Sequence, residues 1–148
     1  PFTLQGSHMA FRTPVDIAAL NANCRGTMIE HLGIVITEAG EDWLRGTMPV
    51  DARTKQPYGL LHGGASVVLA ETLGSTAGGL CVDPARDAVV GLEINANHLR
   101  AARGGIVTGT ARALHVGRST QVWEIRIENE AGKPVCISRL TLAVVPAG

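Results

Sequence analysis

The stretch that most constrains the fold of this chain runs from His62 to Gly79, "HGGASVVLAETLGSTAGG". Its residues are small or apolar on nearly every side of a helix, which is typical of a helix that protein surrounds on all faces. One carboxylate, Glu71, stands in its middle, and the stretch contains no lysine or arginine. The sequence therefore predicts a long core helix that carries a single unusual charge.

Strand-like segments flank this helix on both sides. Residues 33–50 predict two short strands about a polar turn at 38–42, and four more follow at residues 88–99, 104–116, 119–130 and 133–145. In two of them apolar residues alternate with polar ones, which predicts one buried face; the expected buried residues are Val90, Leu92, Ile94, Ala96, Trp123, Ile125 and Ile127. We expect an α+β fold, in which an antiparallel sheet of five or six strands wraps the long helix.

The remaining segments fit one domain. Thr13 as a capping residue, with Pro14 at the first helical position, predicts a short helix near the start, and residues 28–33 predict one further turn. The opening "PFTLQGSHM" resembles a protease-site and cloning remnant, so we expect residues 1–8 to be an expression-tag remnant and residues 9–148 to form a single domain. No repeat or linker divides the chain.

Charge and cysteine content exclude several classes of function. The chain has 13 basic and 13 acidic residues, which is unlike the basic surface of a nucleic-acid or membrane-surface binder. Cys24, Cys81 and Cys136 are odd in number and far apart, so they indicate reduced core thiols and neither disulfides nor metal ligands. No apolar run is long enough to span a membrane and no leader is present, so we expect a cytoplasmic protein. Because the sequence has no CxxC pattern and no cluster of histidine and cysteine, we expect no metal site.

Glu71 has two interpretations. A lone glutamate usually points to solvent. Its neighbours offer no other charge, however, and a carboxylate in an apolar helix costs several kcal/mol unless it is paired or faces a cleft. Ser75 lies four residues on, on the same helix face, and could donate a hydrogen bond to it. We favour a carboxylate in a functional cavity.

The beginning of the helix is the second candidate feature. The Gly63 and Gly64 amides are among the first donors of the helix, where the dipole favours negative charge, and glycine lets a substrate carbonyl approach closely. This arrangement suits an oxyanion site for acyl transfer. Either glycine alone could equally serve a tight turn, but Gln56 and His62 lie just upstream, where they could orient a carbonyl or a water.

Helix geometry keeps the two features apart. Gly63 and Glu71 are eight residues apart, which corresponds to roughly 12 Å at about 1.5 Å per residue. They cannot both contact one carbonyl in a single chain. If both act on it, one subunit supplies Gly63 and a second supplies Glu71, which predicts an obligate homodimer with two equal sites.

The segments "MPVDARTKQPYGLLHGGASVVLAETLGSTAG" and "VVGLEINANHLRAARGG" closely resemble the hotdog-fold acyl-CoA thioesterases of the phenylacetic-acid-type branch. Within that branch the likeness is greatest to the 1,4-dihydroxy-2-naphthoyl-CoA thioesterases of menaquinone synthesis and the proofreading thioesterases of enterobactin synthesis. The resemblance covers residues 48–144. It implies a central helix wrapped by a sheet that continues across a dimer, commonly with two dimers in a tetramer.

The resemblance also implies roles for single residues. Glu71 would be the catalytic nucleophile or general base, and the Gly63 amide would polarise the thioester carbonyl. Gln56 and His62 would orient the thioester and the water, and Ser75 would position the water or acyl group. The expected substrate-binding residues are Thr72, Tyr58 and Gly64; Tyr58 could line an acyl pocket or simply close its loop.

Coenzyme A, as part of the substrate, needs donors for its phosphates. The chain contains no glycine-rich phosphate motif, so single side chains must serve, and arginine suits forked phosphate contacts. Our candidates are His98, Arg100, Arg118 and Ser119, although each arginine could also be an ordinary solvated charge. No separate cofactor is expected.

Two other functions stay open at this point. A hydratase of the same fold would act on the acyl chain, but such enzymes pair an aspartate with a histidine in a different loop motif. A non-catalytic acyl-CoA-binding dimer would not need the intact Glu71. The acyl group is not readable from residue types, because one methylene changes discrimination by only about 1–3 kcal/mol; the resemblance favours aromatic groups over medium chains.

Overall fold

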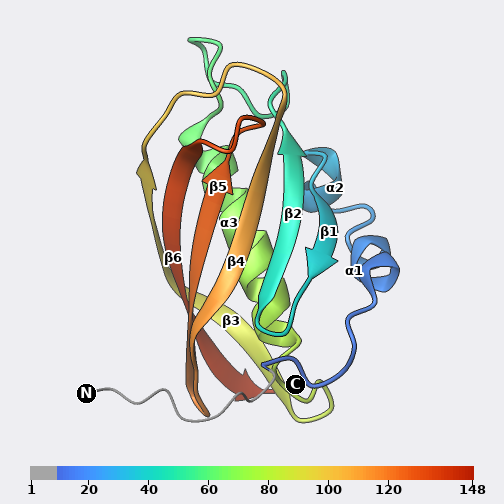
Figure 1. Ribbon diagram of the computed structural model, residues 1–148. Helices are drawn as coiled ribbons and strands as arrows, with labels where there is room; N and C mark the ends of the chain where they lie inside the picture. Colours follow the sequence, from blue (N-terminus) through green and yellow to red (C-terminus); the bar gives the residue numbers. More distant parts are fainter. Residues whose placement is uncertain (1–9) are drawn as a thin grey trace, which may run out of the picture.

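The computed structural model describes residues 10–148, and the expected tag remnant at residues 1–8 lies outside them. The described chain forms three helices and six strands (Figure 1). In order they are α1 (Ile17–Asn23), α2 (Met28–His31), β1 (Val35–Ala39), β2 (Trp43–Pro49), α3 (Gly63–Gly79), β3 (Asp87–His98), β4 (Ile106–Val116), β5 (Thr120–Glu128) and β6 (Pro134–Pro146).

The six strands form one antiparallel sheet in the order β1-β2-β4-β5-β6-β3. Its strands curve around α3, which lies along the concave face, while α1 and α2 lie beside β1 and β2 (Figure 1). The predicted α+β arrangement of a long helix wrapped by five or six strands is confirmed. The predicted helix is confirmed as well, with α3 beginning one residue after His62.

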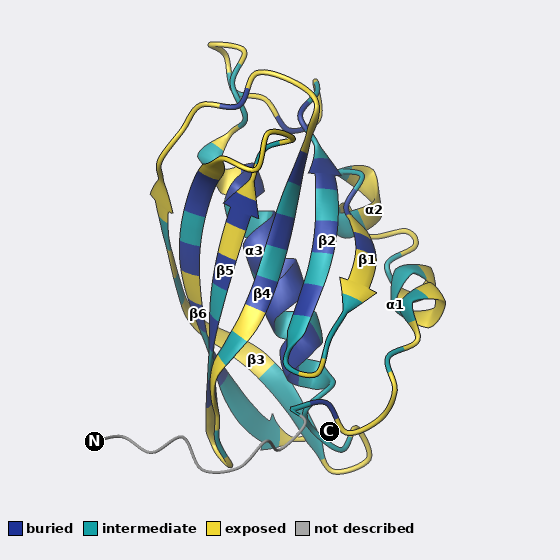
Figure 2. Cartoon of the chain, viewed as in Figure 1, coloured by how far each residue is buried: buried dark blue, intermediate teal, exposed yellow. Residues whose placement is uncertain are grey.

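The core lies between α3 and the concave face of the sheet (Figure 2). Trp123 is fully buried there, as are Ile125 and Ile127, so the alternation predicted for β5 is confirmed. Glycine brings the helix close to the sheet: a Cβ on Gly74 would lie 2.6 Å from Leu140 Cδ2. Small residues along α3 therefore set the distance between the two layers.

The prediction for β3 was wrong at two positions. Val90 and Leu92 are 47% and 61% exposed, whereas Ile94 and Ala96 are half-buried. The pairing of β3 with β6 shifts register between Gly91 and Glu93, so a bulge interrupts the alternation there. In addition, β3 is an edge strand, so one of its sides has no neighbouring strand to cover it.

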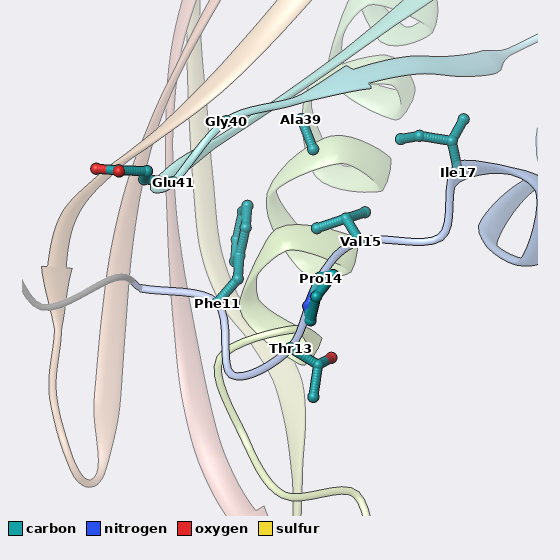
Figure 3. Close-up of a pocket in the computed structure, with 8 residues that line it drawn as sticks. All are labelled: Phe11, Thr13, Pro14, Val15, Ile17, Ala39, Gly40 and Glu41. Atoms are coloured by element: carbon teal, nitrogen blue, oxygen red, sulfur yellow. The ribbon is translucent and has the colours of Figure 1, made fainter.

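The N-terminal cap was also misplaced. Helix α1 begins at Ile17, and its cap is Asp16, whose carboxylate accepts a hydrogen bond from the Ala19 amide at 3.0 Å. Thr13 and Pro14 belong to the irregular segment that precedes the helix. That segment borders a hollow of about 210 Å³ beside the β1–β2 turn, with Phe11, Val15 and Ala39 among its walls (Figure 3). The buried Phe11 ring stacks on Trp123, with centroids 6.4 Å apart.

All three cysteines are free, as predicted, but only Cys136 is fully buried in the core; Cys24 and Cys81 are half-buried. Burial raises the pKa of Cys81 to about 11 and also raises that of Cys136. Between residues 10 and 148 no cluster of three or more potential metal ligands occurs. None of the helices in this range is long and apolar enough to cross a membrane.

Candidate active site

One backbone amide in the first turn of α3 has no hydrogen-bond acceptor in the described chain. The His62 side chain caps the helix, because its Nδ1 accepts a hydrogen bond from the Gly64 amide at 2.8 Å. Because Nδ1 accepts this hydrogen bond, Nε2 is the ring nitrogen that can donate. Within residues 10–148 the Gly63 amide has no acceptor. Of the two amides that the sequence offered, only that of Gly63 is free for a ligand.

The loop before α3 orients Gln56. The Gln56 amide donates to the Leu60 carbonyl at 2.8 Å, and Gly59 turns the chain with a φ of 78°. The side-chain oxygen of Gln56 accepts a hydrogen bond from the Tyr58 amide. The Gln56 amino group is therefore left to donate. Tyr58 itself is 85% exposed and lines neither of the hollows beside α3.

A hollow of about 340 Å³ lies at the start of α3. It brings together four predicted residues, Gln56, Gly63, His98 and Arg100, with a fifth, Ser66, that the sequence reasoning did not single out. A Cβ on Gly63 would lie 2.8 Å from His98 Nε2, so the imidazole lies directly against this glycine. The only sequence signal for Ser66 is its spacing, because residues three apart share a helix face.

A second hollow of about 440 Å³ lies farther along α3 and holds Glu71. Thr72 and Ser75 line it too, which confirms that Glu71 and Ser75 share a face, although no hydrogen bond joins them. Its other walls are Met28, Ile29, Val67, Val68 and Thr76. The contribution of α2 to this hollow was not predicted, since residues so distant in sequence meet only through tertiary packing.

Glu71 is half-buried and belongs to none of the ion pairs found within residues 10–148. Its carboxylate points toward β3, where a Cβ on Gly91 would lie 2.5 Å from Glu71 Oε1. The glycine at the β3 bulge thus leaves room for the carboxylate. The charge stands between an apolar wall and the exposed edge strand, which makes it available to a ligand or to another chain.

The two hollows share no lining residue. Gly63 and Glu71 lie at the first and ninth positions of α3, and the roughly 12 Å expected from helix geometry separates their backbones. One chain therefore holds the two halves of the predicted site without joining them.

Arg118 and Ser119 lie at the other end of the molecule. The Ser119 carbonyl accepts a hydrogen bond from the Val144 amide near the end of β6, whereas His98 pairs with Cys136 near the start of β6. Eight residues of strand separate these points, which is about 26 Å at about 3.3 Å per residue. Within one chain the four predicted coenzyme A residues therefore form two groups, one at each end of the sheet.

Comparison with known proteins identifies the class. Residues 58–136, more than half of the chain, match the thioesterase superfamily. The chain is 53% identical over 137 residues to 1,4-dihydroxy-2-naphthoyl-CoA hydrolase of Escherichia coli, covering 93% of this chain and 100% of the relative. It is also 53% identical over 137 residues to the proofreading thioesterase EntH of Cronobacter sakazakii, covering 93% and 99%.

Comparison with solved structures gives the same class of protein. A mutant of thioesterase PA1618 from Pseudomonas aeruginosa superposes with a TM-score of 0.92 at 54% identity, covering 93% of this chain and 99% of that one. The chain belongs to the thioesterase superfamily and has its hotdog fold. It is a thioester hydrolase.

Proposed function

We propose that this protein is a cytoplasmic enzyme that hydrolyses acyl-CoA thioesters, preferably aromatic ones, to the free acid and coenzyme A, in a site built by two subunits. One observation carries the proposal. The Gly63 amide, which has no acceptor in the described chain, and the Glu71 carboxylate both belong to α3 but line two separate hollows. Each hollow supplies half of the chemistry that thioester hydrolysis requires.

The chemistry begins at the thioester carbonyl. Its oxygen accepts a hydrogen bond from the Gly63 amide, which the helix dipole reinforces as negative charge develops. Glu71 either attacks the carbonyl carbon to form a mixed anhydride that water then hydrolyses, or takes a proton from a water that attacks instead. In both routes the C–S bond breaks, the thiolate leaves and takes up a proton, and water is the only co-reactant. No separate cofactor takes part in the reaction as proposed.

Polar side chains around each half support these steps. The free amino group of Gln56 and the Nε2 proton of His62 can donate to the thioester or to the water. On the other half, the hydroxyl groups of Thr72 and Ser75 line the Glu71 hollow, where they can hold the acyl group or the water. Gly64 contributes its small size, since its amide already caps the helix.

A two-fold dimer through β3 would join the two halves. The outer edge of β3 has no neighbouring strand in the described chain, and the exposed Val90 and Leu92 lie on that strand. Pairing two such edges antiparallel continues the sheet, covers the apolar side chains and turns opposite ends of the two chains toward each other. The Glu71 of one subunit then faces the Gly63 of the other. We extend the proposal to a dimer of dimers from the family resemblance alone.

The same two-fold axis would bring the predicted coenzyme A residues of the two subunits together. His98 and Arg100 line the Gly63 hollow, while Arg118 and Ser119 lie at the opposite end of their own chain. In an antiparallel dimer the partner's hairpin comes to the end that holds His98. We therefore propose that one nucleotide contacts Arg100 of one subunit and Arg118 of the other, as forked phosphate donors.

The walls of the second hollow support an aromatic acyl group as the substrate. Met28, Ile29, Val67 and Val68 give it apolar walls around Glu71. The name of the Escherichia coli relative, a 1,4-dihydroxy-2-naphthoyl-CoA hydrolase, supports an aroyl substrate and a place in menaquinone synthesis. The same apolar walls would also accept a medium-length alkyl chain, so the preference is tested with both kinds of thioester.

The first test is thiol release from a panel of benzoyl-, phenylacetyl-, naphthoyl- and medium-chain acyl-CoAs, run for the parent and for Glu71→Ala. We expect aroyl-CoA turnover by the parent and a loss of several orders of magnitude in a variant that remains folded. A non-catalytic binder would bind the same compounds and release no thiol. A hydratase would change the acyl chain while its thioester bond persisted.

The two-subunit arrangement has a separate test. Glu71→Ala and Gln56→Ala chains are unfolded together, mixed in equal amounts and refolded. Random pairing makes half of the dimers mixed, and each mixed dimer has one intact site of two, so about a quarter of the parent activity should return. No recovery would mean that both residues serve a site within one chain.

A further inference from the structure

Ser66 is a buried hydroxyl residue at the wall of the Gly63 hollow. It is 1% exposed, yet it lines that hollow together with Gln56, Gly63 and His98. Within residues 10–148 its hydroxyl makes no hydrogen bond, and it is not fully sealed inside the protein as the unpaired Ser138 Oγ is. A hydroxyl that lines the hollow and has no partner in the protein is free to donate a hydrogen bond to a ligand there.

Helix geometry directs this hydroxyl toward the open amide. Ser66 follows Gly63 by three residues, so both lie on one face of α3. Side chains of an α-helix tilt toward its N-terminus, which brings the Ser66 hydroxyl toward the first turn, where the Gly63 amide is free. The Ser66 amide itself is occupied, since it donates to the His62 carbonyl at 3.3 Å. Only the hydroxyl is left to act on a ligand.

We infer that Ser66 is a second hydrogen-bond donor to the thioester carbonyl oxygen, beside the Gly63 amide. The inference rests on the proposed thioesterase function. The hydroxyl donates a hydrogen bond as negative charge gathers on the oxygen, keeps its own proton and forms no covalent bond. Two donors on one oxygen hold it in a fixed position, whereas the Gly63 amide alone leaves it free to swing.

The test compares Ser66→Ala with Ser138→Ala, because Ser138 is also a buried serine without a hydrogen-bond partner in the described residues but does not line the Gly63 hollow. Steady-state thiol release from benzoyl-CoA is measured for both variants and the parent. Benzyl-CoA, a thioether that lacks the carbonyl, serves as the binding probe in calorimetry. Loss of one oxyanion donor typically lowers kcat by roughly 100-fold or more.

We expect Ser66→Ala to lower kcat by roughly 100-fold or more with an unchanged Kd for benzyl-CoA, and Ser138→Ala to keep the parent kcat. An unchanged kcat in Ser66→Ala overturns the inference about Ser66. The proposed function still stands in that case, provided that the parent releases thiol. A parallel loss of benzyl-CoA binding shows a packing role and also overturns it. If the parent releases no thiol, the proposed function fails and the inference fails with it.

Discussion

The backbone of Gly63 lies against the imidazole of His98, so that a Cβ on the glycine would lie 2.8 Å from His98 Nε2. The contact joins the first residue of α3 to the last residue of β3. A side chain at this position would force the imidazole to move. The φ of Gly63 is not in the left-handed region, so the position does not demand glycine on conformational grounds.

Gly63→Ala should therefore lower thioesterase activity by pushing His98 aside and narrowing the hollow. A shift of about 1 Å at a reacting group can cost about 100-fold in rate, and we expect a loss of roughly that size in kcat/KM. The double variant Gly63→Ala/His98→Ala removes the contact. It should lose less than the sum of the two single changes, measured as a double-mutant cycle; strict additivity would contradict the role of the clash.

Gly91→Ala should disturb Glu71 from the other side. The new Cβ would lie 2.5 Å from Glu71 Oε1, so the carboxylate must move away from β3. We expect kcat to fall by about 100-fold while circular dichroism stays native. Gly79→Ala is the matched control, because nothing lies within 4 Å of a Cβ there. Equal activity of the two variants would show that the position of Glu71 does not limit catalysis.

Leu92→Lys should prevent assembly. Leu92 is 61% exposed on the edge strand β3, and burying a lysine across a pair of such edges is costly. Light scattering should show a monomer, and thiol release should fall with it. Val35→Lys, on the opposite edge strand β1 and 47% exposed, is the control that should assemble as the parent does. A dimeric Leu92→Lys would place the interface elsewhere.

Gly46→Ala should destabilise the fold without touching the site. A Cβ at this buried position would lie 2.8 Å from the Val35 carbonyl oxygen and 2.9 Å from Leu73 Cδ2. Overpacking of this kind costs about 1–3 kcal/mol, which urea denaturation would detect as a lower midpoint. Gly104→Ala, where a Cβ meets nothing within 4 Å, should unfold like the parent. An unchanged midpoint for Gly46→Ala would mean that β1 and α3 can give way.

Cys81 should react slowly with alkylating reagents. Burial disfavours the thiolate and raises the pKa of Cys81 to about 11, so at pH 8 the reactive form is scarce. The rate of iodoacetamide modification of the Cys81 peptide, followed by mass spectrometry in the folded protein, should keep rising up to about pH 11. In the unfolded chain it should level off near the ordinary value of 9. A plateau near pH 9 in the native protein would contradict the effect of burial.

The local elements of this protein were readable from the sequence because their causes are local. The small and apolar residues of α3 predicted its burial and its bounds to within one residue. The alternation of Trp123, Ile125 and Ile127 with charged neighbours predicted the two faces of β5. The constant rise of an α-helix was enough to separate Gly63 from Glu71. Each of these inferences needs only neighbouring residues and a fixed helical or strand period.

Tertiary structure decided what depends on residues distant in the chain. Asp16, and not Thr13, is the cap of α1, because the irregular segment at the start of the described chain continues up to Asp16 before the helix begins. Leu92 is exposed because β3 has a bulge after Gly91 and lies at the edge of the sheet. Which residues of a strand are covered depends on its neighbours in the fold, and the period of the sequence alone does not reveal them. The same packing brought Met28 and Ile29 of α2 to the hollow that holds Glu71, and brought His98 against Gly63. The sequence by itself determined the elements and their chemistry, and the three-dimensional packing decided which of those groups meet, since contact between distant residues is a property of the folded chain as a whole.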